Sequence, residues 1–191
     1  MALTTAGNGI DSSGVPCNVP AGIKALFLAD AADVTGLDFA ATGDFVVTSI
    51  TPSGQFEKID FKSQQCQVTE TLEKNEFGNS FNTIEIEADI TKFDKTQRRA
   101  FDEIDQVCNL VGIAQKYDGR FMLVGADVNL GVDGVRFEQS GMEQTDERGI
   151  EGGNYAIVKY TAMQTQVMYE YDGSGDSATT EAAKVTWLTG S

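Results

Sequence analysis

The chain has 191 residues, 41% of them hydrophobic, and carries 29 acidic against 14 basic side chains, for a formal net charge of −15. A chain of this length and composition can bury a sizeable core as one domain. Its negative field repels nucleic acids and anionic membranes, which argues against specific binding to either. The chain contains no His, so His-dependent catalytic triads and the common zinc sites are excluded.

Targeting signals are not evident in the sequence. No segment approaches the roughly 20 consecutive apolar residues that a membrane-spanning helix needs. The first residues have neither the basic region nor the long apolar region of a secretory signal. We therefore expect the protein to be made and assembled in a cytoplasm.

The N-terminal half predicts an arm followed by strands. Residues 1–22 are rich in Gly, Ser, Thr and Pro, which predicts an extended N-terminal arm. Short β-branched and aromatic runs separated by turn residues then predict a mainly β domain over residues 23–171. A loop is expected after the first strand, through about residue 42. The first strands are expected at residues 23–29, 45–50, 56–61 and 65–72.

The next strand, residues 81–90, carries an acidic row. Apolar and acidic residues alternate along it with a period of two, so one face should be buried and the other exposed. The predicted buried face consists of Ile84, Ile86, Ala88 and Ile90, and the exposed face of Glu85, Glu87 and Asp89. Such a row suits any solvated sheet. Repeated around a symmetric ring, it would line a channel with negative charge.

One flanking helix is predicted at about residues 94–109. Asp94 is a suitable N-cap, and Gln97, three residues later, completes a pair that resembles a capping box. The apolar residues that follow have the spacing of one helical stripe. They are Ala100, Phe101, Ile104, Val107, Cys108 and Val111.

The remaining elements are strands, a loop and a tail. Strands are expected at residues 110–115, 120–124, 134–138, 155–163 and 165–171, with a long polar loop at residues 139–154. Residues 172–191 predict a flexible C-terminal tail that ends in an apolar patch, Trp187 and Leu188. This patch packs on its own domain or docks on a neighbouring subunit. Phe77, on the predicted turn before the acidic strand, has the same two interpretations.

The Cys and acidic residues do not form a recognisable site. Cys17, Cys66 and Cys108 lack the spacing of a metal or redox motif, and we expect Cys66 and Cys108 to be buried in the core. Residues 172–176 resemble the start of a calcium loop, but its later Gly and Glu are missing. No phosphate-binding loop or nucleophile constellation is present. We therefore predict a protein that is not an enzyme and uses no cofactor or metal.

The order of these segments resembles the tail-tube fold of bacteriophage virion proteins. The likeness is closest to structural proteins of phages that infect Bacteroidetes, including crAss-like phages. It is carried by residues 94–101, 116–125 and 154–162, and it spans about residues 81–171. The resemblance implies a β-sandwich or half-barrel with one flanking helix, assembled into rings of six or twelve copies. Strands of neighbouring subunits would pair into a continuous barrel.

This resemblance implies a structural function in the virion, in the tail or neck. Glu85, Glu87 and Asp89 would face the lumen of a channel through which DNA passes without specific binding. Phe77, Trp187 and Leu188 would contact neighbouring subunits. The partners would be further copies of the chain and other tail, neck or portal proteins. The N-terminal arm and the C-terminal tail would act as assembly segments.

A different class of function is also compatible with the sequence. A monomeric β-sandwich could bind a carbohydrate or protein ligand through the loop at residues 139–154 and nearby aromatic side chains. The candidate aromatic residues are Tyr155, Tyr160, Tyr169 and Tyr171.

Overall fold

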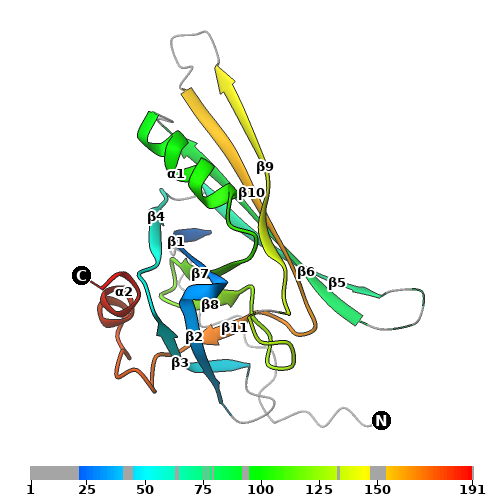
Figure 1. The fold of residues 1–191 in the computed structure, drawn as a ribbon, viewed down its shortest axis with the longest axis vertical. Helices are drawn as coiled ribbons and strands as arrows, with labels where there is room; N and C mark the ends of the chain where they lie inside the picture. Colours follow the sequence, from blue (N-terminus) through cyan, green and yellow to red (C-terminus); the bar gives the residue numbers. More distant parts are fainter. Residues whose placement is uncertain are drawn as a thin grey trace.

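The protein is mainly β, as the sequence predicts, with two sheets and two short helices (Figure 1). The computed structural model describes residues 22–40, 45–62, 65–74, 76, 78, 80–91, 95–132, 134–146 and 154–190. Phe77 and the N-terminal arm therefore lie outside the described residues.

The larger sheet has seven strands, and all neighbouring pairs are antiparallel except β3 and β11. A short 3₁₀ helix (Ala31–Asp33) joins its first two strands in the chain. In spatial order the strands are β2 (Val34–Phe39), β3 (Val46–Pro52), β11 (Tyr169–Tyr171), β8 (Phe121–Val124), β7 (Leu110–Lys116), β1 (Ile23–Asp30) and β4 (Glu57–Asp60).

The smaller sheet has four antiparallel strands. In spatial order they are β5 (Cys66–Lys74), β6 (Ser80–Thr91), β10 (Asn154–Gln164) and β9 (Phe137–Asp146). Its long strands run diagonally past the larger sheet, and α1 (Lys95–Asp105) lies beside their upper part in Figure 1. The second helix, α2 (Glu181–Thr189), lies beside the larger sheet, on the side of β3 and β4.

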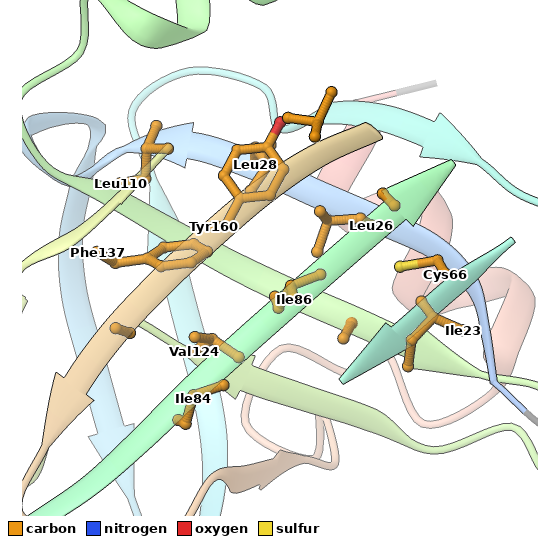
Figure 2. Close-up of a cluster of buried hydrophobic side chains, with 14 of the residues drawn as sticks. Ile23, Leu26, Leu28, Cys66, Ile84, Ile86, Leu110, Val124, Phe137 and Tyr160 are labelled. Atoms are coloured by element: carbon orange, nitrogen blue, oxygen red, sulfur yellow. The ribbon is translucent and has the colours of Figure 1, made fainter. Parts of the chain in front are cut away.

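The first hydrophobic core lies between the two sheets (Figure 2). Leu26 and Leu28 of β1 belong to one buried cluster with Ile84 and Ile86 of β6, and all four side chains are at most 2% exposed. Burying one such side chain stabilises the fold by roughly 1.5–3 kcal/mol. The alternation along β6 therefore fixes which face of the smaller sheet is turned inward.

A second core covers the opposite face of the seven-stranded sheet. Ala25 and Phe27 alternate with Leu26 and Leu28 along β1, and all four are buried, so this strand is covered on both faces. Helix α2 contributes Leu188, which is completely buried in the second core. The backbone N–H of Phe56 also donates a hydrogen bond to the carbonyl of Leu188, at 2.9 Å.

The C-terminal segment differs from the flexible tail that its Gly-rich sequence predicts. Asp176 accepts hydrogen bonds from the Ser49 hydroxyl at 2.6 Å, the Ile50 N–H at 2.9 Å and the Tyr171 hydroxyl at 2.7 Å. Burial, and then the hydrogen bond to Asp176, raise the pKa of Tyr171 well above its ordinary value. One carboxylate therefore holds the turns of residues 172–180 against two strands of the larger sheet.

Helix α2 has capping signals at both ends. The Thr180 side chain accepts a hydrogen bond from the N–H of Ala183, and Gly190 ends the helix in the left-handed conformation, with φ 66°. The Lys184 ammonium donates to the Tyr171 carbonyl at 2.9 Å and lies 5.1 Å from the centre of the Phe121 ring. The domain therefore has two helices where the sequence predicts one.

Three other predictions are corrected. Residues 139–146 of the segment predicted as a loop are strand, because β9 continues to Asp146, whereas β10 lies within one residue of its predicted boundaries. Strand β2 lies where the sequence predicts a loop, because register shifts near both of its ends disguise the period of two. Helix α1 ends at Asp105, so the helical spacing no longer turns Cys108 inward: Cys108 is exposed, whereas Cys66 is buried as predicted.

The burial of Leu188 predicts that α2 is required for stability. Leu188→Ala leaves a cavity in the second core and should lower the free energy of unfolding by about 2–5 kcal/mol. Leu72→Ala is the matched control, because Leu72 is 63% exposed, and it should have little effect. Urea unfolding measures both. Equal stability of the two variants would contradict the packing of α2.

A buried carboxylate joins the β10–β11 turn to the loop after β8. Asp127 is fully buried and accepts hydrogen bonds from Thr165 through both its N–H and its hydroxyl, and from the N–H groups of Asn129 and Gln166. Burial raises the pKa of Asp127, but these hydrogen bonds together lower it below its ordinary value.

Asp127→Asn should therefore destabilise the protein by about 1–3 kcal/mol at neutral pH. A carboxyl whose pKa is lowered by folding contributes stability above its unfolded pKa of about 3.9, and this contribution is lost as the pH falls through the folded pKa. The difference in the free energy of unfolding between the original protein and Asp127→Asn should thus become smaller below about pH 4. Unfolding curves at neutral and acid pH test this, with Asp38→Asn, at an exposed position of β2, as the control.

Candidate functional site: an acidic sheet face

The face of the four-stranded sheet that is turned away from the first core is strongly acidic. We call it the outer face. Strand alternation and register place six acidic side chains on it, among those that the structure describes. They are Glu73 of β5, Glu85, Glu87 and Asp89 of β6, and Glu138 and Glu143 of β9.

The register brings these acids into rows across the sheet. Glu87 lies between Gln67 of β5 and Lys159 of β10, and Glu85 lies between Thr69 and Thr161 of the same two strands. Each acid of β6 thus has uncharged or basic nearest neighbours across the strands, which limits like-charge repulsion. The predicted acidic row is therefore accommodated at the centre of the sheet.

Two cations on or beside the outer face are bound to carboxylates. The Lys159 ammonium lies 3.0 Å from a carboxylate oxygen of Glu87, and the Arg136 guanidinium, just before β9, lies 2.7 Å from Glu138. The hydrogen bond to Glu87 and its charge, together with Glu143 and Glu85, raise the pKa of Lys159. The pKa of Lys159 thus responds to acids on both β6 and β9, and the net field of this face is negative.

The outer strands of the same sheet have free edges. Among the described strands, β5 pairs only with β6, and β9 pairs only with β10. An unpaired edge presents N–H and C=O groups that another chain can bind. The long strands also extend beyond the core, where Leu72 is 63% and Met142 is 45% exposed.

The other predicted site residues have different positions. Trp187 is 42% exposed, and its indole N–H donates to the carbonyl of Ile50 at 3.0 Å, so it is attached to its own domain and still partly accessible. Leu188 is completely buried in its own core, which corrects its prediction as an inter-subunit contact. Phe77 lies outside the described residues.

The ligand-binding alternative loses three of its four candidate aromatic residues. Tyr160, Tyr169 and Tyr171 are 1%, 4% and 0% exposed, so none can stack on a carbohydrate at the surface. The side chain of Tyr155 lies outside the description. Tyr160, Tyr169 and Tyr171 pack in the two cores because each falls on an inward position of its strand.

The sequence does not reveal Glu138, Glu143 and Lys159 as members of the acidic face. Alternation along residues 155–163 places the side chain of Lys159 on the face of the strand opposite to that of Val158 and Tyr160. Its partner, however, depends on which strand lies next to β10 and in which register. Glu143 falls in the segment predicted as a loop, and Glu138 is the last residue of the strand predicted at residues 134–138, whose place beside β10 the sequence does not show. Long-range pairing is therefore the missing information.

Comparisons with known proteins do not assign the chain. No family model, curated protein or solved structure matches it. Among the described residues, no group of acidic or Cys side chains is arranged to hold a metal ion. The described helices are also too short and too polar to span a membrane.

Replacing one acid tests the coupling on the outer face. Glu87→Gln removes the hydrogen-bonded charge that raises the pKa of Lys159, so this pKa should fall. NMR titration of the Lys159 side chain measures the change. Glu73→Gln, near the far end of β5, is the matched control and should leave the Lys159 pKa unchanged. An unaltered pKa in the Glu87 variant would contradict the ion pair.

Proposed function

We propose that the protein is a structural subunit of a bacteriophage virion that assembles into rings and forms part of a tail or neck channel. The observation that carries the proposal is the sheet β5–β6–β10–β9, which combines an apolar inner face, an acidic outer face and two free edges. A subunit that lines a channel requires all three features. The resemblance of residues 81–171 to tail-tube proteins supports the same function.

The dimensions of the sheet suit a ring. Neighbouring strands lie about 4.8 Å apart, so six copies of a four-stranded sheet give a circumference of about 115 Å and a backbone diameter of about 37 Å. After side chains are allowed for, this opening still exceeds the width of a DNA duplex. Pairing between β5 of one copy and β9 of the next would close the ring without leaving an edge.

The acidic face suits a channel for DNA. Every Lys or Arg that neutralises a phosphate adds affinity through counterion release, and affinity within a channel acts as friction. On the outer face, Lys159 is bound to Glu87 and the acids are in excess. DNA would therefore be repelled from the wall and kept near the axis of the channel. The protein would act mechanically and electrostatically, with no cofactor and no catalytic step.

Imaging tests ring formation directly. Negative-stain microscopy and mass measurement of the purified protein should show rings or tubes at high concentration. A strictly monomeric protein under all conditions would count against the proposal and in favour of a binding module.

Charge reversal tests the channel. Replacing Glu85, Glu87 and Asp89 together with Lys should slow DNA ejection from assembled particles, because the wall would then attract phosphate. Asp38, Asp102 and Asp105 are exposed acids outside this sheet, and their replacement with Lys is a control with the same change in net charge. The control should eject at the normal rate. Equal ejection rates in both triple variants, with normal folding, would remove the lumen assignment.

A further inference from the structure

The edge strand β4 lies beside an open groove. This groove, of about 750 Å³, lies between β4 and α1. It has an apolar floor and acidic residues along its rim, and Lys58 is the one basic residue among the described residues that line it. The floor includes Leu28, Ile59, Phe61, Phe101, Ile104 and Leu110. The acidic residues of the rim include Asp33, Glu57 and Glu103, whereas Asp60 and Asp89 also line the groove but strand alternation turns their side chains to the opposite faces of their sheets.

The hydrogen bonds of β4 identify its free backbone groups. The Phe61 N–H donates to the carbonyl of Lys24 at 2.8 Å. Because the direction of N–H and C=O groups alternates along an antiparallel strand, Ile59 and Glu57 are also directed toward β1. Lys58 and Asp60 therefore direct their N–H and C=O groups away from β1. Among the described strands nothing else pairs with this edge.

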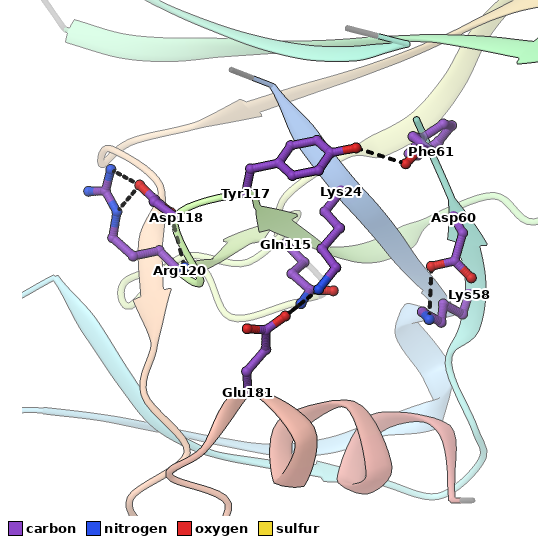
Figure 3. Close-up of polar contacts among 9 residues, drawn as sticks. All are labelled: Lys24, Lys58, Asp60, Phe61, Gln115, Tyr117, Asp118, Arg120 and Glu181. Atoms are coloured by element: carbon purple, nitrogen blue, oxygen red, sulfur yellow. Dashed lines mark hydrogen bonds and ion pairs between the residues drawn. The ribbon is translucent and has the colours of Figure 1, made fainter. Parts of the chain in front are cut away.

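The arrangement is suited to strand addition. An extended segment that pairs with the free edge of β4 would place alternate side chains in the groove between this strand and α1. The ion pair between Lys58 and Asp60, 2.8 Å long, joins the side chains of the two residues with free backbone groups (Figure 3). The side chains of Ile59 and Phe61 belong to the other face, toward the groove and the first core.

The N-terminal arm has the sequence that this edge requires. Val15, Cys17 and Val19 alternate with Pro16, Asn18 and Pro20. If the backbone groups of Val15, Cys17 and Val19 form the hydrogen bonds to β4, both prolines fall at positions where no backbone N–H is needed. Residues 1–21 contain no Lys or Arg and a single acid, Asp11, so the acidic rim repels this segment less than it would repel the rest of the chain.

Strand geometry also fixes the direction of the added segment. In parallel pairing, the residues that bond to Lys58 and Asp60 have side chains on the same face as Ile59, which is the groove. In antiparallel pairing, the groove-facing residues would direct their N–H groups away from β4. Pro16 and Pro20 would then occupy the positions that donate hydrogen bonds to β4, although proline has no backbone N–H to donate. Only the parallel arrangement satisfies both the prolines and the apolar side chains.

The arm of the same chain is poorly placed to reach this edge. Only Pro20, Ala21 and Gly22 separate Val19 from β1, and β4 lies between β1 and the free edge. At that end, Tyr117 reaches across from the β7–β8 turn, and its hydroxyl donates to the Phe61 carbonyl at 3.1 Å (Figure 3). The direct route for a three-residue link is therefore obstructed. The arm of another copy has no such constraint.

We infer that residues 15–19 of a second copy add to the free edge of β4 as a parallel strand, with Val15, Cys17 and Val19 in the groove. This contact joins two copies of the chain and does not involve any molecule that passes through the ring. It rests on the self-association proposed above but not on the cargo of the channel.

Cross-linking between two marked chains tests the contact. One chain keeps Cys17 and carries Cys108→Ser. The other carries Cys17→Ser, Cys108→Ser and Ala100→Cys, because Ala100 is exposed and lines the groove. Cys66 is buried in both. A short bis-maleimide should join the two chains when they are mixed. Asp105→Cys in place of Ala100→Cys is the control, because Asp105 is exposed on α1 but does not line the groove.

Two proline variants of the arm test the register without disturbing the folded domain. Val19→Pro removes an N–H that the bond to β4 requires and should lower the cross-linking yield about fivefold, the effect of one backbone hydrogen bond. Asn18→Pro falls at a position directed away from β4 and should keep the yield. Equal yields in the two variants would overturn the proposed register.

The remaining outcomes separate the two proposals. Rings without a link between Cys17 and Ala100→Cys would overturn strand addition and leave the ring proposal standing. When both cysteines are placed in one chain, a link confined to that chain would show that the arm occupies its own groove, and would also overturn the inference. A protein that never associates would overturn both.

Discussion

The inner strands β1 and β7 of the seven-stranded sheet are buried on both faces, and the rest of the molecule depends on this constraint. Along β1, four consecutive side chains from Ala25 to Leu28 are at most 2% exposed, so the strand needs a cover on each side. The four-stranded sheet covers one face, and α2 contributes Leu188 and Val185 to the core on the other. The outer face is acidic because only the inner face of the smaller sheet is needed for this cover.

Local patterns predict the elements that are covered on one face. The alternation from Ile84 to Ile90 gives the correct inward and outward faces of β6, because a period of two is a property of any single strand. The register shifts of β2 break that period, so the sequence predicts no strand there. At the C-terminus, Gly173 and Gly175 suggest flexibility, whereas the fixed position of this segment comes from hydrogen bonds to Ser49 and Ile50, more than 120 residues away.

The candidate site shows the same division between local and distant information. The sequence predicts the outward direction of Glu85, Glu87 and Asp89, but the pairing order of the strands determines which charges lie beside them. Lys159 neutralises part of the row from β10, and Glu143 reinforces it from β9. An acidic strand therefore becomes an acidic sheet only through contacts between residues far apart in the chain.

The position of Trp187 has a practical consequence. It is the single Trp of the chain, it lies on α2, and its indole N–H is bound to the carbonyl of Ile50 on β3. Its fluorescence therefore originates from the point where the last helix meets the second core. Detachment of α2 would break this hydrogen bond, expose the buried part of the indole to water and shift its emission, while the acidic sheet on the other side of the molecule contributes no Trp signal. The fluorescence of Trp187 therefore reports whether α2 is packed on the second core.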